Sequence, residues 1–175
     1  MYKEIFFLLL ILFASACSKD KEVKTSGTHT ITSEMILEGQ TYSYYGFSFS
    51  KASVKLYNVA SSTDRPDFGV GMNQDSLPYF DTENIEESFA LAGEFSTADS
   101  ALTFFNNYGE VDVNSYVGLA QPVLENQIWV FKTRSNTFGK ILIMNTLRYE
   151  KNSYMIVEVH FKWVYQPDGS STFLE

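Results

Sequence analysis

The most restrictive feature of this sequence is a regular alternation of side-chain types near its C-terminal end. Successive side chains of a β-strand point to opposite faces, so apolar residues at every second position predict a strand with one face in the core. The opposite face carries Glu158, His160 and Lys162. We therefore expect a long core strand here and a mainly β fold. The alternating apolar residues are Met155, Val157, Val159, Phe161, Trp163 and Tyr165.

Shorter segments repeat this alternation and predict further antiparallel strands. Tyr45, Phe47 and Phe49 form one apolar face, and Trp129 and Phe131 form another. In the stretch 67–72, the apolar side chains alternate with glycines, which let a ligand or another backbone approach closely. A further strand is expected after the turn at 166–169, extending through Phe173.

One clear helix and one long polar loop interrupt these strands. Ser96 can cap a helix over 97–107, with Asp99 as an acidic partner three positions on. The acidic segment 73–87 reads as a loop, and long loops are often functional.

Composition supports a single packed domain without disulfides. The chain of 175 residues has 15 Phe, 11 Tyr and 2 Trp but only 1 Cys. The formal net charge of −8 disfavours nucleic acid as a partner. We expect an antiparallel β-sheet or sandwich over residues 37–175, with one or two short helices.

The N-terminal segment has the layout of an export signal. Lys3 precedes the apolar run 5–13, which is too short to span a bilayer as a helix and is followed by small residues. Ala14-Ser15-Ala16-Cys17 resembles the lipobox of bacterial lipoproteins, in which the cysteine is lipidated and becomes the first residue. The alternative is a secreted protein with a spare thiol at Cys17.

This resemblance divides the chain into a signal peptide over residues 1–16, a lipidated Cys17 with a flexible tether over 17–36, and the folded domain. The charged run 18–22 resembles the signals that place Bacteroidetes lipoproteins on the outer face of the outer membrane. A solvated tether would have the same composition, so both interpretations of this run stay open.

The usual motifs of catalysis and metal binding are missing from the sequence. The two histidines, His29 and His160, are far apart in sequence, and no nucleophile elbow, P-loop or dinucleotide fingerprint occurs. The carboxylates in 81–87 could ligate calcium, although a solvated helix start has the same composition. The strand methionines Met72, Met144 and Met155 are either core fillers or ligands. We therefore expect a protein that is not an enzyme.

The C-terminal third resembles the end of HmuY-like lipoproteins of Bacteroidetes. The resemblance lies in Gln127–Arg134, Phe138–Ile143 and His160–Gly169 with Phe173, in which a hairpin precedes an aromatic strand that ends in Gln-Pro-Asp-Gly. It implies a mostly β domain on the outer membrane, at the cell surface, that captures haem between loops. It also implies transfer of haem to a TonB-dependent transporter, and iron held by two histidines or two methionines.

Two functions are compatible with these features. The first is capture of haem or another porphyrin, with Met72, Tyr79, Met144 and His160 as candidate ligand-binding residues and the segment 71–80 as the rim. The second is a structural or accessory lipoprotein that binds a protein or glycan through exposed aromatic side chains. The candidates for that role are Tyr42, Tyr44, Tyr79 and Tyr154.

Overall fold

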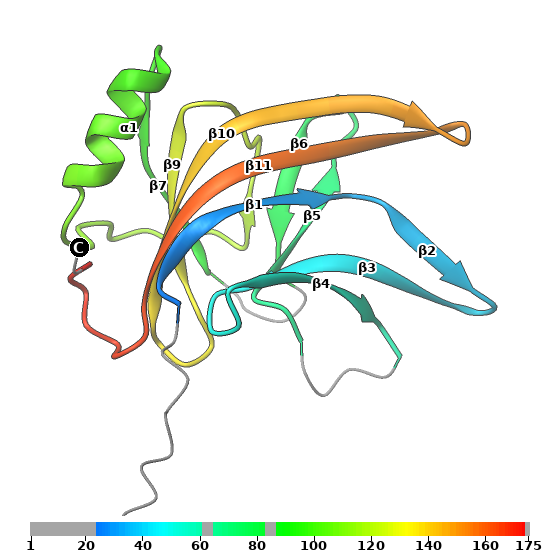
Figure 1. Cartoon of the computed structure of the whole chain (residues 1–175), viewed down its shortest axis with the longest axis horizontal. Coiled ribbons are helices and arrows are strands. Elements are labelled where there is room, and N and C mark those ends of the chain that lie inside the picture. The colour runs from blue at the N-terminus through cyan, green and yellow to red at the C-terminus, as the bar shows by residue number, and fades with distance from the viewer. Residues whose placement is uncertain (1–23, 61–64, 83–86, 174–175) are drawn as a thin grey trace, which may run out of the picture.

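The computed structural model describes residues 24–60, 65–82 and 87–173, and shows two antiparallel β-sheets and one short helix (Figure 1). This confirms the expected mainly β, single-domain fold. The predicted signal peptide over 1–16 and Cys17 lie outside the described residues. The elements are β1 (Ser26–Thr32), β2 (Met35–Glu38), β3 (Thr41–Ser48), β4 (Ser53–Asn58), β5 (Phe68–Met72), β6 (Pro78–Asp81), β7 (Phe89–Glu94), α1 (Ala98–Asn107), β8 (Leu119–Ala120), β9 (Gln127–Lys132), β10 (Phe138–Lys151) and β11 (Tyr154–Gln166).

The chain passes between the two sheets at several points, and the first crossing lies between β1 and β2. The first sheet has the order β1-β11-β10-β9-β7, and the second has the order β2-β3-β5-β6-β8 with β4 paired to β3. The chain passes from one sheet to the other at Ser33 and Glu34. The Ser33 amide donates to the Val157 carbonyl at 2.9 Å, and Glu34 forms an ion pair with Lys151 at 2.7 Å. The crossing is therefore fastened to β10 and β11.

Aromatic side chains fill the space between the sheets. The Phe47 ring centroid lies 5.0 Å from Phe49, 5.2 Å from Phe161 and 5.3 Å from Trp163. The alternation in β11 is confirmed, since Phe161 and Trp163 are fully buried. Its first apolar residue, Met155, is 42% exposed and lies near the tip of the β10–β11 hairpin, which projects from the body of the molecule (Figure 1).

Helix α1 covers the outer face of the first sheet, where Phe105 packs against Ile128 and Leu142. The helix predicted over 97–107 is confirmed, with Thr97 rather than Ser96 as its cap: the Thr97 hydroxyl accepts from the Ser100 amide at 3.2 Å. The helix lies on the side of the molecule away from the projecting β2–β3 and β10–β11 hairpins (Figure 1).

The prediction of a flexible tether over 17–36 is wrong for its second half. Residues 26–32 form β1 on the edge of β11, and β2 begins at Met35, so the folded domain starts well before residue 37. The physical reason is that alternate β1 side chains point into the core. Ile31 is buried, and the His29 ring stacks on Trp163 at 6.3 Å.

Two further expectations are corrected. The segment 73–87 is not all loop, because it contains β6, whose Phe80 is buried in the core; residues 83–86 lie outside the described part of the chain. The predicted strand through Phe173 is also absent. Thr172 makes an isolated bridge to Glu110, and Phe173 packs against Tyr108 instead.

Candidate functional site

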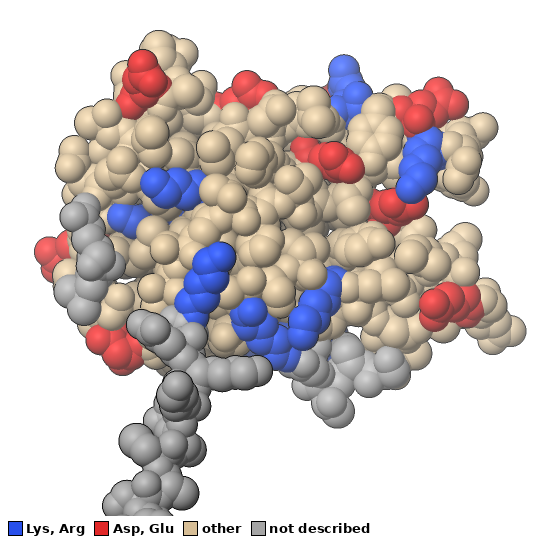
Figure 2. Space-filling view, in the orientation of Figure 1, with Lys and Arg blue, Asp and Glu red and all other residues tan. Residues whose placement is uncertain are grey.

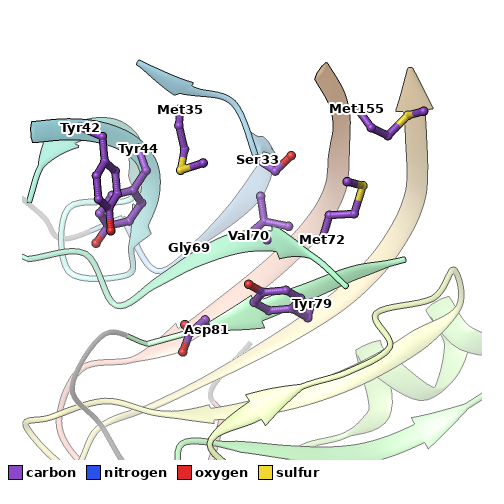
Figure 3. A pocket seen from close by; sticks show the side chains of 11 residues that line it. Ser33, Met35, Tyr42, Tyr44, Gly69, Val70, Met72, Tyr79, Asp81 and Met155 are labelled. Carbon is purple, nitrogen blue, oxygen red and sulfur yellow. The ribbon is translucent and has the colours of Figure 1, made fainter. Parts of the chain in front are cut away.

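The candidate site lies where two strands, β2 and β5, pair with different parts of one edge of β3. Residues 41–44 of β3 pair with β2, whereas Gly46 and Phe47 pair with β5 on the same edge. Because β2 and β5 then diverge, a hollow of about 350 Å³ opens between them and β11. We call it the methionine groove (Figure 3). Its lining residues are Ser33, Met35, Tyr42, Tyr44, Gly69, Val70, Gly71, Met72, Tyr79, Asp81 and Met155.

Two glycines of β5 hold tyrosine rings against the strand. A Cβ on Gly71 would lie 2.3 Å from Cζ of Tyr79, and a Cβ on Gly69 would lie 3.2 Å from the Tyr44 ring. The sequence predicted that the glycines admit a ligand or another backbone. In the structure, the groups that approach them are these two rings. The groove therefore has an aromatic surface that is already formed in the free protein.

Three methionines come to the groove from three different strands. Met35 belongs to β2, Met72 to β5 and Met155 to β11. Figure 3 shows Met35 on the β2 side, with Met72 and Met155 on the other side of Val70. Met35 is 61% exposed. Flexible thioether side chains left open to solvent are characteristic of binding surfaces for apolar ligands.

Asp81 supplies the single carboxylate among the lining residues. Partial burial raises the pKa of this carboxyl above its ordinary value, and a hydrogen bond from the Thr82 backbone opposes the shift. No Lys or Arg lines the groove, so the charge of Asp81 is not compensated within the lining. The groove is therefore better suited to an apolar or cationic group than to an anionic one.

The structure brings together two of the four predicted ligand-binding residues. Met72 and Tyr79 both line the groove. Met144 instead lies at the irregularity of β10 between Ile143 and Asn145, where it is exposed. His160 is on the outer face of β11, opposite the face that packs in the core. Met144 and His160 therefore do not line this groove.

Sequence reasoning missed Met35 as a site residue, because it fell within the predicted tether. Met155 can be a core filler or a ligand by its sequence alone, but it is not among the four candidate ligand-binding residues. Tyr42 and Tyr44, named for a partner surface, prove to be groove residues. A signal for Met35 was present in the sequence: the apolar run 35–37, the turn at Gly39-Gln40 and the tyrosines that follow together indicate a hairpin.

A second hollow of about 600 Å³ lies beside β7 and contains none of the predicted site residues. Its apolar lining includes Leu91, Val117 and Trp129, with Ser115 and Gln121 as polar members. It has no titratable or sulfur-bearing side chain, so the methionine groove is the better candidate.

The described residues contain no group of three or more His, Cys, Asp or Glu side chains that could hold a metal ion. The two histidines belong to different strands and lie on opposite faces of the first sheet: His29 stacks in the core, and His160 is on the outer face. No helix in the described ranges has the length and apolar character needed to cross a bilayer. Comparisons with models of protein families, with curated proteins and with solved structures find no match.

Proposed function

We propose that this chain is a non-enzymatic outer-membrane lipoprotein, anchored at Cys17, whose β domain binds haem or a similar planar porphyrin in the methionine groove. The resemblance of the C-terminal third to HmuY-like lipoproteins supports the membrane location, exposure at the cell surface and delivery to a TonB-dependent transporter. The lipobox supports the anchor independently of that resemblance.

The observation that carries the proposal is the meeting of three methionine side chains with tyrosine rings in one groove. Thioether sulfur is an established ligand of haem iron, and tyrosine oxygen is another. Aromatic rings also provide flat apolar surface for a macrocycle. The residues present therefore fit the chemistry of haem. The two histidines cannot hold one iron between them, because His29 and His160 lie on opposite faces of the first sheet.

The size of the groove indicates how such a ligand would be held. At about 350 Å³ it lies near the lower end of the usual range for ligand pockets, roughly 300–1,000 Å³. A porphyrin seated there would extend outward between the β2–β3 and β10–β11 hairpins, with its apolar ring in the groove and its two carboxylates in solvent, away from Asp81. A partly exposed ligand suits a carrier that passes its cargo to a second protein.

A haem titration of the mature chain tests this proposal. A saturable shift of the Soret band at one equivalent supports binding, and a flat titration in both ferric and ferrous states overturns the haem assignment. Met35→Leu, Met72→Leu and Met155→Leu remove sulfur while preserving most of the side-chain volume. Met144→Leu is the matched control, because Met144 is an exposed methionine outside the groove.

Loss of the shift in at least one groove variant, with the control unchanged, would assign the ligand to the methionine groove. An identical Soret shift in all four variants would place haem elsewhere.

A specific observation also favours the second candidate function, binding of a protein or glycan. Leu37 is 76% exposed on the β2–β3 hairpin and Tyr154 is 70% exposed on the β10–β11 hairpin. Both residues are close in sequence to groove methionines, since Leu37 follows Met35 by two positions and Tyr154 precedes Met155. Recovery of one partner from solubilised outer membranes by the wild-type chain, but not by Leu37→Asp/Tyr154→Asp, would support this function.

A further inference from the structure

The end of the molecule where the described chain begins carries exposed cations, although the whole chain has a net charge of −8. Lys24, Lys51 and Arg134 are exposed there, and we call these three residues the basic end. Figure 2 shows Lys and Arg side chains gathered beside the point where the grey N-terminal trace meets the fold. An asymmetry of this kind in an acidic protein points to an anionic partner.

Local contacts place Lys24 and Lys51 at this end. Lys24 Nζ lies 3.2 Å from the position that a Cβ on Gly27 would take, at the start of β1. Lys51 lies in the turn between β3 and β4. That turn is fastened to β1, because His29 Nε2 donates to the Ala52 carbonyl at 3.0 Å.

Arg134 reaches the same end from the turn between β9 and β10. Asp67 lies between this turn and the turn that carries Lys51, and its carboxylate accepts from the Phe49 amide at 2.7 Å. Burial raises the pKa of Asp67, while the charges of Arg134 and Lys51 both act to lower it. The two cations therefore belong to one region of the surface. An exposed acid, Asp168, also lies near this end, in the turn whose Gly169 lies beside Asn136.

The correction of the tether length brings this end close to the proposed anchor. With β1 starting at Ser26, only seven peptide steps separate Cys17 from Lys24. Seven residues of fully extended chain span at most about 25 Å. A tether over 17–36 would have allowed the domain to move freely, whereas this short connection keeps its basic end near the lipid surface.

We propose that the basic end docks on the phosphate headgroups of an anionic lipid surface and so orients the domain on its membrane. This inference rests on the proposed anchorage through Cys17. Each Lys or Arg near an anionic membrane surface contributes about 1 kcal/mol. The β2–β3 and β10–β11 hairpins project away from this end (Figure 1), so docking leaves the methionine groove accessible to ligand and partner.

The experiment uses the lipidated full-length mature protein in vesicles of phosphatidylcholine alone or with 30% phosphatidylglycerol. Because the chain has one cysteine, which the lipid occupies, an added cysteine is its only free thiol. An environment-sensitive dye is attached at Ser135→Cys, beside Arg134, or at Glu150→Cys, near the tip of the β10–β11 hairpin. A quencher fixed at the lipid headgroups reports which end approaches the membrane.

We expect strong quenching at position 135 on anionic vesicles and weak quenching at position 150. Lys51→Glu/Arg134→Glu should reduce the quenching at 135 at least several-fold, as should the vesicles without phosphatidylglycerol. Equal quenching at both positions, or no dependence on anionic lipid, overturns the docking. The mass of the protein tests the anchor separately. A Cys17 without lipid overturns the proposed anchorage and the docking together. Lipidated protein in which the dyes at positions 135 and 150 are quenched equally overturns only the docking.

Discussion

Lys140 of β10 gives the sharpest test of the fold, because its ammonium group is buried beneath the end of helix α1. Lys140 Nζ donates to the Phe105 carbonyl at 2.7 Å and to the Tyr108 carbonyl at 2.8 Å. Carbonyls in the last turn of a helix have no partner within the helix. The lysine therefore caps α1 from the sheet beneath it, and its charge complements the negative end of the helix dipole.

The expected cost of Lys140→Met follows from these contacts. Hydrogen bonds to an ionised donor contribute about 1.5–3 kcal/mol each, and a carbonyl left buried without a partner adds a penalty. Removing the ammonium group also removes its own desolvation cost, which offsets part of the loss. We expect the free energy of unfolding to fall by about 2–4 kcal/mol, which for a domain of this size lowers Tm by about 5–15 °C.

Thermal and urea unfolding, followed by far-UV circular dichroism, measure this loss. Lys162→Met is the matched control, since Lys162 also lies against Phe105 but donates to Asn106 Oδ1 in an exposed hydrogen bond of 3.2 Å. The control should lose less than about 1 kcal/mol. Equal losses in the two variants, or an unchanged Tm in Lys140→Met, would refute the capping role.

Three further predictions concern the groove and the first strand. Gly71→Ala should displace the Tyr79 ring, because the new Cβ would fall 2.3 Å from Cζ of that ring. We expect a titration to show at least tenfold weaker ligand binding. An unchanged affinity would show that the ring is not part of the site. Asp81→Asn should bind an anionic porphyrin more tightly at pH 7. In the wild type, affinity should rise as the pH falls through the raised pKa of Asp81, and a pH-independent difference between the two proteins would contradict this. His29→Ala should lower the free energy of unfolding by about 1–3 kcal/mol, because it removes a ring stacked on Trp163 and a hydrogen bond; no change in urea unfolding would mean that β1 adds little to the fold.

The sequence determined the fold class because the period of a strand is visible in the chain itself. Alternation in β11 identified the core face, and Phe161 and Trp163 are buried as predicted. The helix over 97–107 could be predicted because its cap and apolar positions are local. Local sequence patterns did not predict β1. Its threonine-rich sequence resembles a tether, and it forms a strand because it pairs with β11.

The site was decided by tertiary structure. Met35, Met72 and Met155 are far apart in sequence, and nothing local indicates that they share a groove. They meet because the chain changes sheets at Ser33 and because β2 and β5 divide one edge of β3. For the same reason Met144 and His160, which resemble ligands in the sequence, lie outside the groove. Strand alternation assigns a residue to a face, whereas pairing between distant strands decides which faces enclose a common space.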